Sequence, residues 1–358
     1  MILKDQNVLF FTRTMKLGGT ENVILQLCEI FKPLVNKIVV CSCGGVNEKE
    51  LDKLNIKHYV IPDIEEKKLI VFINTIKAIK KIVSDEKITV IHTHHRMAAF
   101  YVKLLELNKH CYFINTSHNT FENKKILTRY AYKGCHLVAC GEMVKNNLQR
   151  YFNLNDVTVI HNSVKPFTGP VSFISDFQEE KGKGQLLIGN IGRLSKQKGM
   201  EYYIKAIPKV LSKVNNVQFY IIGEGEDEDK LKHMCMEEGV HVSFLGYRKD
   251  IQNIMAQLDL IVLSSLWEGL PLTPIEAFSV GKTIVATDVD GNAEIVKDGY
   301  NGYLVEARNP DALAAKIIEL CSNNETRCYF ESQAALTYSN EFSFERFKNC
   351  YINYYESL

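Results

Sequence analysis

The chain has 358 residues, which is too long for one hydrophobic core and predicts two domains of ordinary size. Its 46% apolar and 24% charged residues are typical of a folded globular protein and exclude disordered and fibrous classes. The net charge of +1 hides an asymmetry, because residues 1–165 carry a balance of +9 and the remainder carries −8, which indicates that the first half meets an anionic surface.

The first half alternates short β-branched runs with helical patterns, which predicts a parallel sheet covered on both faces. The predicted strands are residues 7–12, 37–42, 57–61, 90–92, 112–117, 136–140 and 157–160. The predicted helices include residues 21–31, 65–83, 97–107 and 142–151.

Residues 165–184 are rich in glycine and proline and lack apolar periodicity, so we interpret them as an interdomain linker. A second alternating set of elements follows. Its predicted strands are residues 186–192, 217–222, 242–245, 260–264, 283–286 and 303–305, and its helices include residues 200–214, 229–238, 272–280 and 310–321.

A last helix is predicted over residues 344–355. The fold class is therefore α/β, with two Rossmann-like, doubly wound parallel-sheet domains that we expect to face a central cleft. We assign residues 1–165 with residues 341–358 to an acceptor-binding domain and residues 166–340 to a donor-binding domain.

The most informative segment runs from Glu268 to Glu276. A helix is predicted to begin near Leu272, with Pro274 in its first turn, where proline is tolerated. The unpaired N–H groups around Leu272 and Thr273 are suited to a diphosphate. Glu276 could accept hydrogen bonds from two vicinal ribose hydroxyls, and Glu268 projects to the side where a sugar would lie. Taken alone, the two glutamates are better explained without a function, Glu276 by compensation of the helix dipole and Glu268 by a solvated loop.

Basic side chains follow two other predicted strands of the second half. Arg193 and Lys198 follow the first of these strands next to glycines, where they can converge on a phosphate, although an exposed loop pair fits the pattern as well. Tyr247 and Arg248 could form the floor under a nucleobase. Asp288 and Asp290 imitate a metal-binding carboxylate pair, but their place at a strand end beside glycine leads us to predict no metal site.

At this point the sequence resembles the family 4 retaining glycosyltransferases of the GT-B fold, over essentially the whole chain. The resemblance is carried by the following segments: residues 18–21 (GGTE), 116–118 (TSH), 159–162 (VIHN), 192–194 (GRL), 198–199 (KG), the pair Glu268 and Glu276, and residues 291–302. It departs from the usual Asn-Gly at Asn162-Ser163 and from the usual Ser-Glu at Gly141-Glu142.

The resemblance implies a role for each matching residue. Arg193 and Lys198 would hold the donor diphosphate, Glu276 the ribose and Glu268 the donor sugar, and His118 would sit near that sugar across the cleft. The backbone at Gly18 and Gly19 would approach the distal phosphate, while Tyr247 and Arg248 would contact the base. The reaction implied is hexosyl transfer with retention, without a metal or another cofactor, from a nucleotide-diphosphate sugar, with UDP favoured.

The acceptor is expected to be a hydroxyl of a lipid-linked oligosaccharide in exopolysaccharide or capsule synthesis, because relatives of the family often modify such molecules. Residues 65–83 predict an amphipathic helix with Leu69, Phe72, Ile73, Ile76, Ile79 and Val83 on one face. Its lysines, residues 67, 68, 77 and 81, are either solvated or dock on an anionic membrane leaflet.

Three histidines, His92, His94 and His95, precede Arg96 at a predicted strand end. They read as acceptor contacts or as ordinary loop histidines, and a zinc site would need a fourth ligand that the sequence does not identify. The ten cysteines form no CxxC pair, no run is long enough for a membrane span, and residues 7–11 already form a strand rather than a signal. We therefore expect a cytoplasmic protein, at the inner face of the membrane if its lysines dock there, with no nucleic-acid partner.

Two rival functions share the predicted fold. A nucleotide-sugar 2-epimerase would need acid–base carboxylates and histidines around the sugar, and the layout of Arg193, Lys198, Glu268 and Glu276 suits transfer better. The intact phosphate and sugar residues argue against a non-catalytic nucleotide-sugar-binding subunit. A nicotinamide dehydrogenase is disfavoured, because no GxGxxG with a downstream ribose carboxylate follows the first strand.

Overall fold

The computed structural model describes residues 1–289 and 291–358 and divides into two compact units. Unit 1 comprises Met1–Asn162 and Glu345–Leu358, and unit 2 comprises Ser163–Phe344. The sequence had suggested boundaries at residues 165 and 341, so the difference is confined to a few residues of the connections.

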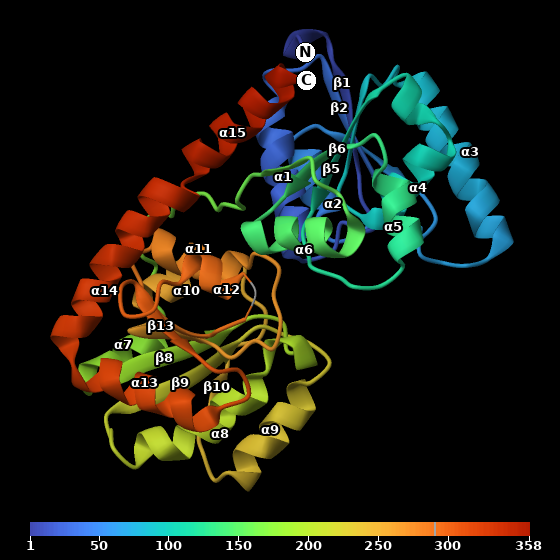
Figure 1. Cartoon of the computed structure of the whole chain (residues 1–358). Helices are drawn as coiled ribbons and strands as arrows, with labels where there is room; N and C mark the ends of the chain where they lie inside the picture. The colour runs from blue at the N-terminus through green and yellow to red at the C-terminus, as the bar shows by residue number, and fades with distance from the viewer. Residues whose placement is uncertain (290) are drawn as a thin grey trace. The chain divides into compact units, whose positions relative to one another are not determined.

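Unit 1 contains a seven-stranded sheet in the order β3-β2-β1-β4-β5-β6-β7, with all neighbours parallel (Figure 1). Its strands are β1 (Asn7–Phe11), β2 (Lys37–Ser42), β3 (Lys57–Val60), β4 (Val90–Thr93), β5 (Tyr112–Ser117), β6 (His136–Ala139) and β7 (Val157–Val159). Its helices are α1 (Gly19–Phe31), α2 (Glu48–Lys53), α3 (Leu69–Asp85), α4 (Arg96–Leu104), α5 (Lys125–Tyr132), α6 (Glu142–Phe152) and α15 (Phe344–Ser357).

The central strands β1, β4 and β5 are buried except at the first residue of β1 and of β5, because helices cover both faces of the sheet (Figure 1). Helix α15 brings the end of the chain back to its beginning, and the amino group of Met1 donates to the carbonyl of Glu356 at 2.7 Å. Tyr351 and Tyr355 of α15 are fully buried in this unit, so the last helix is part of its core.

Unit 2 contains a six-stranded parallel sheet in the order β10-β9-β8-β11-β12-β13. Its strands are β8 (Leu186–Ile191), β9 (Val217–Ile222), β10 (Ser243–Phe244), β11 (Leu260–Leu263), β12 (Ile284–Thr287) and β13 (Gly302–Val305). Its helices are α7 (Ser175–Gly182), α8 (Met200–Leu211), α9 (Glu228–Glu237), α10 (Ile251–Gln257), α11 (Leu272–Ser279), α12 (Asn292–Ile295), α13 (Pro310–Ser322) and α14 (Asn324–Thr337).

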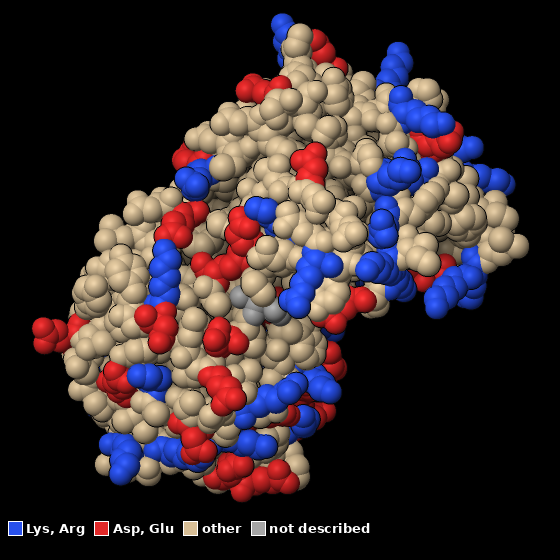
Figure 2. Space-filling model, in the orientation of Figure 1, with Lys and Arg blue, Asp and Glu red and all other residues tan. Residues whose placement is uncertain are grey.

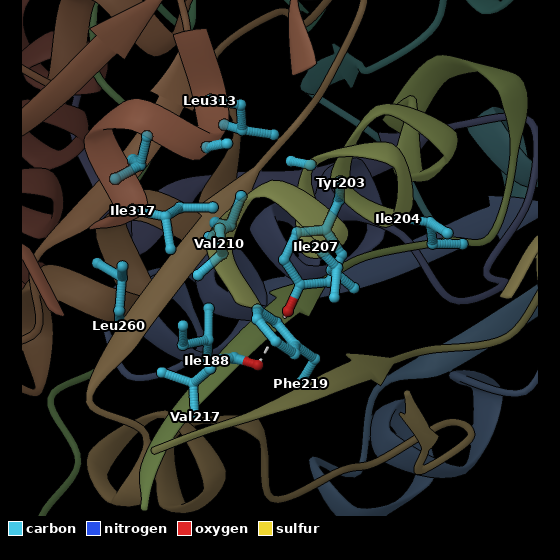
Figure 3. Packing of buried hydrophobic residues seen from close by; sticks show 14 of the residues in the cluster. Ile188, Tyr203, Ile204, Ile207, Val210, Val217, Phe219, Leu260, Leu313 and Ile317 are labelled. Atoms are coloured by element: carbon cyan, nitrogen blue, oxygen red, sulfur yellow. Dashed lines mark hydrogen bonds between the residues drawn. The ribbon is translucent and has the colours of Figure 1, made fainter. Parts of the chain in front are cut away.

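The core of unit 2 fills the space between its sheet and helices α8 and α13 (Figure 3). Val217 and Phe219 of β9 pack with Ile207 of α8 and Ile317 of α13. The buried hydroxyl of Tyr203 donates to the carbonyl of Ile188 at 3.0 Å, so the one polar group of that side chain is satisfied inside the core.

Both sheets have a topological switch point, where the strand order reverses and where open α/β sheets bind ligands beyond the carboxyl ends of their strands. In unit 1 the switch point lies between β1 and β4, and in unit 2 it lies between β8 and β11. The loops after these four strands therefore hold the residues of interest.

The predicted strands are all confirmed, each to within one residue at either end. The linker prediction was incomplete, because residues 175–182 form helix α7, of which only Phe177 is buried and which therefore shows no apolar periodicity.

The predicted helix over residues 65–83 begins later, at Leu69. Asp63 accepts the N–H of Glu65 in a local turn, and Glu65 pairs with Arg13, which keeps this segment out of the helix. Its buried residues are Thr75, Ile79 and Ile82, and the predicted apolar face was wrong at Leu69 and Ile73, which are exposed.

Candidate functional site

The switch point of unit 2 brings Lys198 and Glu268 together, although 70 residues separate them in the chain. The Lys198 ammonium lies 2.5 Å from Oε1 of Glu268, and the two side chains are 17% and 6% exposed. Ser265 donates its hydroxyl to the same Oε1 at 2.7 Å, and Gln197 approaches Oε2 at 3.5 Å. A largely buried ion pair is tolerated only when further hydrogen bonds satisfy its oxygens, as they do here.

The backbone around this pair is fixed by small residues and short polar contacts. Gly192, with φ of +156°, follows β8, and a side chain there would press on the methylenes of Lys198 at 3.3 Å. The hydroxyl of Ser264 donates to the carbonyl of Lys198 at 3.0 Å. Gly291 passes so close to the carbonyl of Gly269 that an added Cβ would lie 1.7 Å from it. The loop that carries Glu268 is therefore held from two sides.

Helix α11 supplies the third charged group of this cluster. It begins at Leu272 as predicted, and in the part of the chain that the structure describes no side chain caps its first turn. Burial raises the pKa of the half-buried Glu276 to about 7, and the positive charge of Lys198 partly opposes this shift. The uncapped N–H groups of Leu272 and Thr273 thus lie one turn before a carboxyl group that is half ionised near neutral pH.

Arg193 also follows β8, but the structure gives its guanidinium a different partner. It is 72% exposed and pairs with Glu226 at 3.0 Å, whereas Lys198 pairs with Glu268. Arg248 makes a bidentate pair with Asp250, at 2.9 and 2.8 Å, and Tyr247 beside it is 40% exposed. The predicted contacts of Arg193, Tyr247 and Arg248 with a nucleotide stay predictions.

The switch point of unit 1 forms a pocket of about 320 Å³. The loops after β1, β4 and β5 supply most of its lining, including Arg13, His94, Arg96 and His118, and Glu21 of α1 closes one side. At the start of α1, Thr14 donates to Glu21 at 2.6 Å, and a side chain at Gly18 would approach the Glu21 carboxylate to 2.5 Å. Gly18 and Gly19 thus begin the helix beside this pocket.

A stack of histidines runs from the pocket lining, which includes His94 and His118, to the buried His92. The rings of His92 and His94 are 4.3 Å apart between centroids, and Nδ1 of His94 lies 2.9 Å from Nε2 of His118. His92 is fully buried between two hydroxyls, that of Tyr355 on Nδ1 and that of Thr116 on Nε2, both at 2.8 Å. Burial lowers the pKa of His92 to about 3 and that of His118 to about 4, so these rings are neutral near pH 7.

These positions correct one reading of the histidines. His92 and His94 are buried, in or directly after β4, so they are not loop histidines exposed to solvent. Among the described residues, no group of three or more His, Cys, Asp or Glu side chains has the geometry to hold a metal ion. Of the carboxylate pair after β12, Asp288 is exposed and Asp290 lies outside the described residues.

Sequence reasoning missed the residues that complete both sites. Ser265 and Gln197 hold Glu268, and Thr116 and Tyr355 hold His92. Thr116 belonged to a recognised motif, but no sequence signal pairs His92 with Tyr355 of the last helix, 263 residues away. Among the described residues, none of the helices combines the length and the hydropathy that a membrane span requires.

Two family models match the chain in succession. Residues 17–166 match the model described as glycosyltransferase family 4, and residues 172–337 match that of the glycosyl transferases group 1. The predicted resemblance is thereby confirmed in both units.

Individual relatives agree with these models. The chain is 28% identical over 270 residues to a poly(ribitol-phosphate) alpha-N-acetylglucosaminyltransferase of Staphylococcus aureus, covering 74% of this chain and 52% of the relative. It is 25% identical to a UDP-Gal:alpha-D-GlcNAc-diphosphoundecaprenol alpha-1,3-galactosyltransferase of Escherichia coli, covering 85% of each chain. An uncharacterized glycosyltransferase of Methanocaldococcus jannaschii is matched over 60% of its length, so two of these relatives are spanned over less than two thirds.

Solved structures show the same fold. HepE of Anabaena in complex with UDP superimposes with a TM-score of 0.84 at 21% identity, covering 99% of this chain and all of that one. The lipopolysaccharide outer core galactosyltransferase WaaB gives a TM-score of 0.77 at 18% identity, again over 99% and 100% of the chains. The predicted GT-B fold class is therefore confirmed.

Proposed function

We propose that this chain, which belongs to the family 4 glycosyltransferases, transfers a hexosyl group from a UDP-sugar to an acceptor hydroxyl with retention at the anomeric carbon. The observation that carries the proposal is the cluster of Lys198, Glu268 and Glu276 beside the uncapped start of α11. Such a cluster offers positive charge for a diphosphate and carboxylates for the sugars on either side of it.

In this proposal the charge of the leaving diphosphate is stabilised by protein groups rather than by a metal. The N–H groups of Leu272 and Thr273 and the ammonium of Lys198 contact the phosphates. Arg193 also contacts the phosphates after it leaves Glu226. Its ion pair with Glu226 is exposed to solvent and therefore weak. Interactions that strengthen as negative charge develops on the leaving group supply most of the rate enhancement.

The bond changes balance without any further reactant. The bond between the anomeric carbon and the phosphate oxygen breaks, and the acceptor oxygen forms the new bond on the same face. The departing phosphate oxygen takes the acceptor's proton. Glu268 contacts the donor sugar and Glu276 the ribose hydroxyls, while Tyr247 and Arg248 flank the base. For His118, Gly18 and Gly19 we retain the donor contacts that the resemblance implies.

We further propose a lipid-linked saccharide acceptor at the inner face of a membrane. The E. coli relative is a galactosyltransferase with a diphosphoundecaprenol-linked acceptor, and the charge balance of residues 1–165 suits an anionic leaflet. Leu69 and Ile70 are 73% and 61% exposed and follow Lys67 and Lys68. In Figure 2 basic side chains are spread over the surface near α3 and α5, with few acidic ones between them. Binding to anionic vesicles should exceed binding to neutral ones.

The donor proposal is tested by titration with UDP, UDP-glucose, UDP-galactose and UDP-N-acetylglucosamine. Trp267, the single tryptophan, precedes Glu268 and is 46% exposed, so its fluorescence reports binding at this cluster. The correct donor should change that signal and raise the melting temperature with concentration.

Product analysis without an acceptor completes the test. The proposed transferase leaves the donor intact or slowly hydrolysed, whereas an epimerised nucleotide sugar would identify an isomerase of the same fold. Absence of binding by all four nucleotides would contradict the proposal.

A further inference from the structure

The pocket of unit 1 contains two arginines in opposite electrostatic situations. Arg13 pairs with Asp63 through two hydrogen bonds, at 2.9 and 2.8 Å, and with Glu65 at 2.5 Å. Arg96, the first residue of α4, forms no ion pair with any carboxylate in the part of the chain that the structure describes. Its positive charge is therefore uncompensated, although it is half-buried.

The hydrogen bonds of Arg96 orient its guanidinium without neutralising it. Nη1 donates to the carbonyl of Asn123 and to the hydroxyl of Thr128, both at 3.2 Å, and Nη2 donates to Oδ1 of Asn123 at 3.0 Å. The guanidinium also lies over the ring of Phe121, 4.6 Å from its centroid. A planar group that is held at three donors and on one face has lost most of its freedom before any ligand arrives.

The donors that remain have a defined geometry. A guanidinium carries five N–H groups, and among the described residues three of those of Arg96 are engaged. The two that remain are Nε–H and the second N–H of Nη2, which lie side by side on one edge. Arg13 uses this same edge to bind both oxygens of Asp63, so the chain itself shows which chemistry the edge accepts.

The groups around Arg96 add hydrogen-bonding capacity but no compensating ion pair. His94 also lines the pocket, is 4% exposed, and has an Nε2 atom without a partner among the described residues. Burial lowers the pKa of His94 and raises that of Glu21, so both tend towards their neutral forms. Glu65 is the acidic neighbour of Arg96, but its carboxylate is already paired with Arg13.

We infer that this pocket binds an oxyanion of the acceptor, a phosphate or a carboxylate, through the open edge of Arg96. The identification of the anion as part of an acceptor rests on the proposed transferase function. The anion site itself does not, because it is defined by Arg96, Phe121, Asn123 and His94. The acceptor is thus an anionic saccharide, and the anion fixes its position through two parallel hydrogen bonds.

The first experiment measures anion binding directly. The full chain is saturated with UDP, which occupies the diphosphate site of unit 2, and inorganic phosphate or acetate is then added at constant ionic strength while binding is followed by calorimetry. Wild type and the surface control Arg129→Gln should bind phosphate equally, because Arg129 is exposed and lies outside the pocket lining. Arg96→Gln should lose at least about tenfold in affinity, and Arg96→Lys should recover only part of it.

The second experiment asks whether the anion belongs to the acceptor. Alkyl glycosides that are neutral, that carry a phosphate or that carry a carboxylate are compared as acceptors at a saturating donor concentration. We expect one anionic series to have a KM at least about tenfold below the neutral series, and Arg96→Gln to erase that difference without changing the donor KM. The series that benefits identifies the source of the anion.

Three outcomes would overturn the inference. The first is that Arg96→Gln binds phosphate and acetate as tightly as wild type does. The second is that neutral and anionic acceptors have equal KM values. The third is that Arg129→Gln loses as much anion affinity as Arg96→Gln. If Arg96 only ties the segment 121–128 to α4, its substitution would lower the melting temperature and leave anion affinity unchanged. A chain that binds phosphate through Arg96 but no UDP-sugar would instead contradict the proposed function and leave the anion site standing.

Discussion

The two units share one topology but place opposite chemistry at their switch points. In unit 2 the loops after β8 and β11 carry Lys198 and Glu268. Their side chains form a largely buried ion pair with an N–O distance of 2.5 Å. In unit 1 the loops after β4 and β5 carry His94 and His118, whose pKa values burial depresses so that both rings are neutral. The switch point of unit 2 therefore presents a buried ion pair, whereas that of unit 1 presents neutral histidines beside two arginines, of which Arg96 has no carboxylate partner among the described residues.

This difference shows what each edge can do chemically. Preorganised charges act on charge that develops during a reaction, and they are effective because water is excluded from them. The neutral imidazoles of unit 1 fix orientation instead, because His92 is held between two hydroxyls and His94 contacts His118 through a ring nitrogen. We therefore expect substitutions in unit 2 to change the chemical step, and those in unit 1 to change stability and positioning.

The largest effect should follow the loss of positive charge in unit 2. Lys198→Ala and Arg193→Ala should each lower turnover by about 10²–10³, because each removes charge that faces the leaving diphosphate. Transfer from the donor identified by titration measures this, with Lys209→Ala as the control, since Lys209 forms an exposed pair with Asp311. Near-wild-type turnover in both variants would break the comparison.

A second variant separates chemistry from folding at Lys198. The single substitution leaves the Glu268 carboxylate, which is 6% exposed, without its cation, and such a loss costs about 3–5 kcal/mol. Lys198→Ala combined with Glu268→Gln removes that buried charge. Circular dichroism should show that the double variant is more stable than the single one, while transfer remains low. Recovery of activity in the double variant would show that Lys198 acts only on the fold.

The next effect belongs to unit 1 and concerns stability. Tyr355→Phe removes the hydroxyl 2.8 Å from Nδ1 of the fully buried His92, and an unsatisfied buried group costs about 1–3 kcal/mol. Urea unfolding followed by far-UV circular dichroism should show the loss. Tyr329→Phe should change stability by less than about 0.5 kcal/mol, because Tyr329 is half exposed.

Trp267 sharpens this test because it lies in unit 2. If the two units unfold separately, the Tyr355→Phe transition seen by circular dichroism should shift while the Trp267 fluorescence transition stays in place. A shift confined to the fluorescence transition would contradict the role of Tyr355 in unit 1.

The sequence was sufficient for the strands and for the start of α11, because these depend on local patterns. Alternating apolar runs bounded by Gly and Asn define the strands, and Pro274 marks a first helical turn. Helix α7 and the first turn of α3 were missed for the opposite reason. Few buried residues mark α7, and the turn at Asp63 depends on Glu65, whose partner Arg13 lies 52 residues earlier in the chain.

The site residues divide in the same way. Family motifs identified Lys198, Glu268 and Glu276, but not that Ser265 and Gln197 would hold Glu268. The contact of His94 with His118 requires β4 and β5 to be neighbours in the sheet, and the contact of His92 with Tyr355 requires the last helix to return to unit 1. The pairing of Arg193 with Glu226 depends on a side-chain conformation, which a sequence pattern does not determine.

The smallest expected effect concerns the pH dependence of stability in unit 2. Glu276 has a pKa raised by burial from 4.5 to about 7, so between these values the folded chain holds a proton that the unfolded chain has lost. The free energy of unfolding therefore falls as pH rises from about 4.5 to 7, and the loss is complete above about 7. Glu276→Gln is neutral at every pH and escapes this loss, so its melting temperature should rise relative to wild type as pH increases through this window.

Glu331→Gln provides the matched comparison for this prediction. Burial also raises the pKa of Glu331, but Lys282 lies 3.7 Å away and opposes the shift, so its substitution should give a smaller change across the same window. Melting curves at pH 5, 6, 7 and 8 measure both variants.

The binding of UDP-glucose should respond in the opposite sense at Glu276, because the ribose hydroxyls require the ionised carboxylate as acceptor. Wild-type affinity should then rise from pH 6 to 8, while Glu276→Gln binds weakly throughout. A stability difference that is independent of pH would show that Glu276 is already ionised in the folded chain, with a charge balanced by Lys198 rather than suppressed by burial.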